Sequence, residues 1–72
     1  MTCYFVLPIE TTSKSSSIAI ITEVSTNTFV IKENRDPQYF PGRYLENDWE
    51  IDLQNRLLTN KKTGGILKLI EE

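Results

Sequence analysis

The side chains that could carry chemistry are few in this 72-residue sequence, and histidine is absent altogether. Ser-His-Asp and Cys-His relays both use an imidazole as the general base, so neither can be built from this chain. Two other nucleophile candidates remain, Cys3 and a Ser–Lys pair around Lys14. Cys3 lies in an apolar segment, which is typical of a buried structural thiol, and Lys14 lies in a polar stretch that would leave its amine solvated. We therefore expect no enzymatic activity.

The sequence also predicts no metal site and no cofactor. A single cysteine without histidine cannot supply the four ligands of a structural zinc site. Neither G-x-x-x-x-G-K-[ST] nor G-x-G-x-x-G occurs, and the glycines of segment 59–65, TNKKTGG, follow its lysines. Segment 48–52, DWEID, spaces oxygen atoms like the start of a calcium loop, but Leu53 and Thr59 occupy the positions where that loop needs Gly and Glu.

Residues 48–53 alternate between acidic and apolar side chains, which predicts a strand with one wet face. Asp48, Glu50 and Asp52 share that face, while Trp49 lies on the apolar face and is expected in the core. Alternate side chains of a strand stand roughly 6.6–6.8 Å apart, so the three carboxylates cannot share one ion. The acidic face is either simply solvated or a recognition surface for a basic partner.

An aromatic-rich loop precedes this strand. Three of the seven aromatic residues of the chain, Tyr39, Phe40 and Tyr44, lie among Arg35 and Arg43 and two prolines. Aromatic residues and arginine are enriched at binding hot spots, and prolines lower the entropy cost of holding them ready. The alternative is that Phe40 and one tyrosine fold under the sheet and close a thin core. The predicted partner-binding residues are Arg35, Tyr39, Phe40, Arg43, Tyr44, Asp48, Glu50 and Asp52.

The hydrophobic pattern has period two rather than 3.6, which favours strands. We expect strands at 2–10, 17–24, 28–33, 48–53, 57–60 and 66–70. Polar residues 11–17 form the loop expected to be most mobile, residues 34–47 an ordered loop in which Asp36 could start a helical turn, and residues 60–65 a turn with positive φ at Gly64 or Gly65. These elements predict an all-β domain: a small antiparallel five- to six-stranded barrel or curled sheet, SH3-like or OB-like, with at most one short helical turn.

Length and composition complete the expectations. Residues 1–72 are enough for one small domain with a thin core, and a net charge of −2 with a pI near 5.1 disfavours nucleic acid as a partner held by charge. The lone cysteine fits a reducing, cytoplasmic location. The apolar run near the N-terminus lacks a basic region, so no signal peptide or membrane span is expected. Both faces of the first predicted strand are apolar, which favours a homodimer or a partner-bound form.

These observations favour a small non-catalytic protein-interaction module, an accessory subunit or an inhibitor or regulator of a larger macromolecule, of the kind that phages and plasmids often encode. One alternative is a barrel that binds single-stranded nucleic acid by stacking bases on Tyr4, Tyr39, Phe40 or Tyr44. Another is a sponge for a small ligand. Steep weakening of binding with salt would favour nucleic acid over a protein partner.

Overall fold

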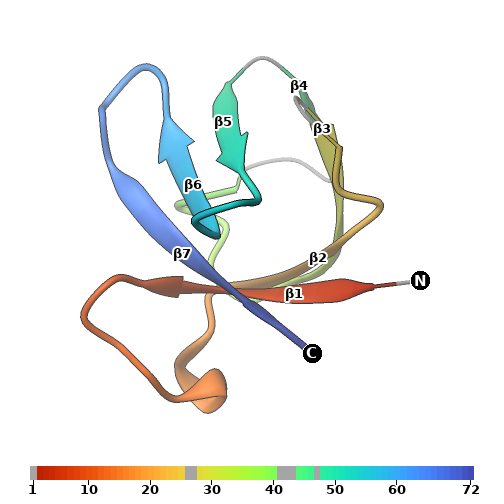
Figure 1. Ribbon diagram of the computed structural model, residues 1–72, viewed down its shortest axis with the longest axis vertical. Helices are drawn as coiled ribbons and strands as arrows, with labels where there is room; N and C mark the ends of the chain where they lie inside the picture. The colour runs from red at the N-terminus through yellow and green to blue at the C-terminus, as the bar shows by residue number, and fades with distance from the viewer. Residues whose placement is uncertain (1, 26–27, 41–43, 47) are drawn as a thin grey trace.

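The computed structural model describes residues 2–25, 28–40, 44–46 and 48–72, with residues 44–46 described by their backbone. The described part forms one antiparallel sheet in the order β4-β3-β2-β1-β7-β6-β5, which curls into a half-barrel (Figure 1). Its strands are β1 (Cys3–Pro8), β2 (Ala19–Thr22), β3 (Thr28–Asn34), β4 (Tyr44–Glu46), β5 (Trp49–Asp52), β6 (Leu57–Asn60) and β7 (Ile66–Glu71). A single 3-10 turn, η1 (Lys14–Ser16), accompanies them. The predicted all-β, antiparallel curled sheet is confirmed.

The sheet of the described residues has one strand more than the five to six expected, because β4 lies inside the segment predicted as a loop. It pairs with β3 through Phe29↔Leu45 and the residue pairs on either side. Three residues are too few for an alternation to be recognised in a sequence, so nothing in the pattern indicated this strand.

Pairing register determines which side chains face the inside of the curl. Residues directly opposite each other on antiparallel strands lie on the same face, so Val6 of β1 shares the inner face with Ala19 of β2 and Leu69 of β7. Trp49 is only 5% exposed on the same face, as its strand pattern predicted. The buried cluster consists of Val6, Ile18, Ala19, Ile21, Phe29, Ile31, Phe40, Trp49, Ile51, Leu58, Leu67 and Leu69.

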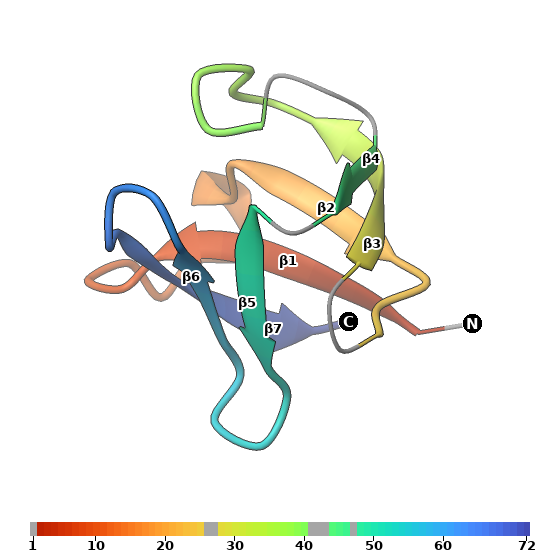
Figure 2. The same ribbon diagram turned by 90° about the horizontal axis from the view of Figure 1, so that it is seen from above.

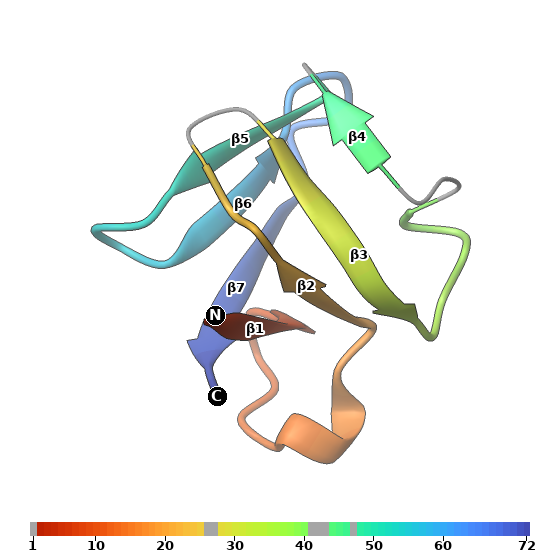
Figure 3. The same ribbon diagram turned by 90° about the vertical axis from the view of Figure 1, so that its right-hand side faces the viewer.

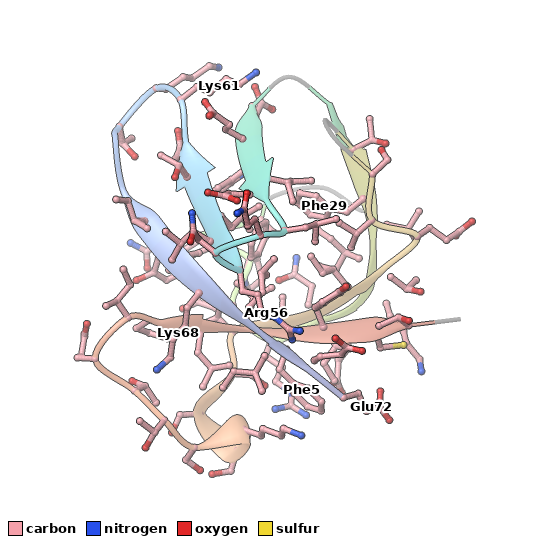
Figure 4. All side chains as sticks on the ribbon, viewed as in Figure 1. Phe5, Phe29, Arg56, Lys61, Lys68 and Glu72 are labelled. Atoms are coloured by element: carbon pink, nitrogen blue, oxygen red, sulfur yellow. The ribbon has the colours of Figure 1, made fainter. Side chains whose placement is uncertain are left out.

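The outer face of β1 is covered as well. Val6 and Leu7 are neighbours that point to opposite faces, yet both are fully buried. The connection from β1 to β2, which contains η1, folds back on the side of β1 away from β5 and β6 (Figure 3). In this connection the Lys14 ammonium lies 5.3 Å from the centroid of the Phe5 ring, and Figure 4 shows Phe5 on the side of β1 opposite Phe29. The chain therefore covers by itself much of the apolar face that suggested a homodimer, and the homodimer stays a prediction.

Glu72 lies beside the start of β1, since its N–H donates to the carbonyl oxygen of Cys3 over 3.0 Å. Among the residues described, no helix is long and apolar enough to cross a membrane.

Candidate binding groove

Four segments that are distant in sequence meet at one end of the sheet: the end of β1, the turn after Asp36, the start of β5 and the turn between β6 and β7. In Figure 2 the end of β1, the connection after β3 and the β6–β7 turn all lie toward the left of the view, away from the chain ends. They enclose a groove of about 440 Å³, within the range of roughly 300–1,000 Å³ that is common for ligand sites. It is lined by Pro8, Ile9, Glu10, Gln38, Tyr39, Trp49, Asn60, Thr63, Gly65, Ile66 and Leu67.

Local hydrogen bonds hold the β6–β7 turn that forms one wall. The Asn60 side-chain oxygen accepts from the N–H groups of Lys62 (2.8 Å) and Thr63 (3.1 Å), and the Asn60 carbonyl oxygen accepts from Gly64 N–H (2.8 Å). Gly64 adopts φ of 78°, the left-handed conformation expected at Gly64 or Gly65. Ile66 and Leu67, which follow this turn at the start of β7, line the groove.

The connection after β3 forms the opposite wall and is tied to the sheet at several points. The N–H groups of Arg35 and Asp36 donate to the Ile18 carbonyl oxygen (3.0 and 3.1 Å), and the Asn34 side-chain amide donates to the Phe40 carbonyl oxygen. Asp36 then starts a single turn, because its carbonyl oxygen accepts from Tyr39 N–H over 3.1 Å. The predicted turn is present, although it does not continue as a helix.

These ties send two neighbouring aromatic side chains in opposite directions. Phe40 is fully buried, with its ring centroid 5.9 Å from that of Phe29 on β3 and 5.1 Å from that of Trp49 on β5. Its side chain thus connects the edge strand β5 with β3, which lies next to the opposite edge strand. Phe40 belongs to the core rather than to the surface, as the second of the two interpretations of this loop has it. Tyr39, in contrast, is 40% exposed and lines the groove.

Exposed apolar side chains concentrate at this groove. Four large hydrophobic side chains of the described residues are strongly exposed: Tyr39, Ile9 (48%), Ile66 (46%) and Leu53 (44%). The first three line the groove, whereas Leu53 lies in the turn at the far end of the β5–β6 hairpin. Clustered exposed apolar surface is the usual mark of an interaction site, while a single exposed side chain such as Leu53 needs no explanation.

The remaining residues of the predicted aromatic loop do not join Tyr39 at the groove. The Arg35 guanidinium donates from Nε to Glu33 over 2.9 Å and from Nη1 to the buried Ser17 hydroxyl over 2.7 Å, so it anchors the connection to the start of β2. Arg43 lies outside the described residues. Tyr44 begins β4, and its side chain is also outside the described part.

The three predicted acidic residues have separate surroundings. Asp48 lies 3.8 Å from the Lys62 ammonium, and Glu50 is exposed on β5. Asp52 accepts from the side-chain amide of Asn55 (2.8 Å) and from its N–H (3.1 Å), so it closes the β5–β6 turn. The Asn55 side-chain hydrogen bond, followed by the backbone one, lowers the pKa of Asp52 below its usual 3.8 because both favour the ionised carboxylate.

Sequence reasoning missed the aliphatic half of the groove. Ile9 and Ile66 were assigned to the ends of strands, and only the exposed position of those ends distinguishes them from core residues. No pattern in the sequence indicated that Glu10 and Gln38 would line a groove.

The arrangement provides apolar and amide contacts but little reactive chemistry. The described residues contain no group of three Cys, Asp or Glu side chains placed to hold a metal ion. Cys3 is partly buried on β1, far along the strand from the groove, with the Lys32 ammonium 3.8 Å from its sulfur. The groove lining offers apolar contacts from Ile9, Tyr39 and Ile66 and side-chain amides from Gln38 and Asn60. Comparisons of the chain with protein-family models, with curated proteins and with solved structures found no match.

Proposed function

We propose that this chain is a small protein-interaction module that holds a segment of a larger partner protein in the groove, as an accessory subunit or a regulator of that partner. The observation that carries the proposal is the concentration of Ile9, Tyr39 and Ile66, three of the four strongly exposed large hydrophobic side chains of the described residues, around one 440 Å³ groove. Binding would remove this apolar surface from water, which is the main favourable contribution to most protein association.

The groove fits a protein segment better than single-stranded nucleic acid. Nucleic-acid binding of that kind needs stacking aromatics surrounded by cations. Of the four aromatic side chains suggested for stacking, Phe40 is buried and Tyr4 packs against the core. No Lys or Arg of the described residues lines the groove. An enclosed small-ligand site is also a poorer fit, because such sites bury most of the ligand whereas the apolar side chains here stand at an open rim.

The proposal is tested by quantitative capture from the native host with a tag at the C-terminus. In Figure 2 the C-terminus lies away from the end of β1 and from the β6–β7 turn, two of the segments that line the groove. Wild type should retrieve a defined protein that Tyr39→Ala and Ile9→Ala lose, each by about 2 kcal/mol or roughly 30-fold in affinity if these are anchors. Leu53→Ala is the matched control, since it removes an equally exposed apolar side chain elsewhere, and it should retain the partner.

Equal retrieval by wild type, Tyr39→Ala and Ile9→Ala would show that the groove is not the binding surface. Retrieval of nucleic acid, lost steeply between low and moderate salt, would instead support the stacking alternative.

A further inference from the structure

We infer that the groove takes a short, extended and largely apolar peptide segment with a lysine or arginine set against Glu10. This inference rests on the proposed function and specifies the chemistry of the partner. It is carried by charge, by the free hydrogen-bonding groups of the lining and by the size of the groove.

The described residues that line the groove carry charge of one sign only. Glu10 is the only charged side chain among the eleven lining residues. It is exposed in the turn after β1, and it has no ion-pair partner among the described residues, in contrast to Asp48, which lies near Lys62. A ligand with a cation at this position would complete a pair that the described residues leave open, whereas an acidic ligand would be repelled.

The uncharged polar groups of the lining are suited to a peptide backbone. The side-chain oxygen of Asn60 already accepts two N–H groups from its own turn, so its NH₂ group is the part left to donate. Gln38 contributes a second side-chain amide from the opposite wall. Amide donors on two walls match carbonyl oxygens of a segment lying between them.

The size of the groove favours a short extended segment. A volume of about 440 Å³ accommodates the side chains of only a few residues. An extended segment sends alternate side chains to one face and carbonyl groups sideways, so it can present apolar side chains to Ile9, Tyr39 and Ile66 while its backbone meets the amides.

The experiment uses a phage-displayed library of random twelve-residue peptides as the probe, panned in parallel on the whole wild-type chain and on single variants. Wild type and Leu53→Ala should enrich peptides that combine apolar residues with Lys or Arg. Glu10→Gln should enrich apolar peptides without the basic preference, and Glu10→Lys should replace it with a preference for Asp or Glu. Tyr39→Ala should enrich nothing above background.

A synthetic peptide from the wild-type selection then gives the magnitude. Because an exposed ion pair contributes about 0.2–1 kcal/mol, Glu10→Gln should weaken binding up to roughly fivefold at 50 mM salt, and the difference should vanish near 1 M salt, where screening acts within about 3 Å. Apolar peptides without a basic residue on wild type, or an unchanged basic preference on Glu10→Lys, would overturn the inference and leave the proposed function standing. No enrichment on wild type would count against both.

Discussion

We expect the buried side chain of Phe40 to contribute more than other single side chains to holding the curled sheet together. It has no exposed surface and contacts Trp49 on the edge strand β5 and Phe29 on β3, next to the opposite edge strand. Truncating a buried phenylalanine to alanine costs about 3–5 kcal/mol, and a domain of this size has only about 3–5 kcal/mol of total stability. Phe40→Ala should therefore leave most of the chain unfolded at 25 °C.

Phe40→Leu is the more informative change, because it keeps an apolar side chain of similar reach. It removes two aromatic contacts, each contributing about 0.5–1.5 kcal/mol beyond burial, so we expect a loss of about 1–3 kcal/mol. Tyr39→Leu alters the adjacent, exposed ring and should change stability by no more than about 0.5 kcal/mol.

Urea titrations followed by circular dichroism and by the fluorescence of Trp49, the only tryptophan, would measure both changes. With an m value of about 1 kcal/mol/M, the midpoint of Phe40→Leu should fall by about 1–3 M while that of Tyr39→Leu stays nearly constant. Equal losses in the two variants, or a larger loss for Tyr39→Leu, would refute the assignment of Phe40 to the core and Tyr39 to the groove.

Three further changes test other parts of the fold. Gly64→Ala should lower stability by about 1 kcal/mol in thermal melts, because a Cβ disfavours the left-handed φ of this residue even though the space around it is open. Gly65→Ala lies outside the left-handed region and should lower stability less. A larger loss for Gly65→Ala than for Gly64→Ala would contradict this account. Arg35→Ala should lower the free energy of unfolding by about 1–3 kcal/mol in urea titrations, because it leaves the buried Ser17 hydroxyl without its partner. Adding Ser17→Ala should recover part of this stability, whereas simple additivity of the two changes would argue against the pair. Because the pKa of Asp52 is lowered in the folded state, its ionised form stabilises the fold above pH 3.8, and this stabilisation is lost as the pH falls through the folded-state pKa. Asp52→Asn should therefore be less stable than wild type at pH 7, and its stability should depend less on pH below about pH 4. Identical profiles of stability against pH for the two proteins would exclude this role.

Much of the sheet could be predicted because strand character is a local property. The alternation of residues 48–53 predicted both β5 and the burial of Trp49, and the apolar run 18–21 predicted the central strand β2. A glycine with positive φ in the turn at 60–65 was also predicted, with Gly64 and Gly65 as the two candidates, and the structure places it at Gly64. Each of these inferences needs only neighbouring residues, because side chains of a strand alternate wherever the strand lies in the fold.

The assignments within the aromatic loop could not be made in the same way. Tyr39 and Phe40 are adjacent, similar in size and without a surrounding period, so either could have been the core residue. Hydrogen bonds between distant residues decide which of the two rings is buried. The N–H groups of Arg35 and Asp36 donate to Ile18, and the Asn34 side chain donates to the Phe40 carbonyl oxygen. Together these bonds set the path of the chain through Tyr39 and Phe40.

The all-β fold class and the lack of a histidine for a catalytic relay both follow from the amino-acid sequence alone, because residue types and period-two alternation are local properties of the chain. Where the exposed apolar side chains gather depends instead on the packing of distant segments. Ile9, Tyr39 and Ile66 stand far apart in the chain, and they become one surface because the sheet curls, the β3–β4 connection is tied to β2, and Phe40 is buried while its neighbour stays in solvent. Exposure is a property of how segments pack against one another, so it is absent from any local pattern.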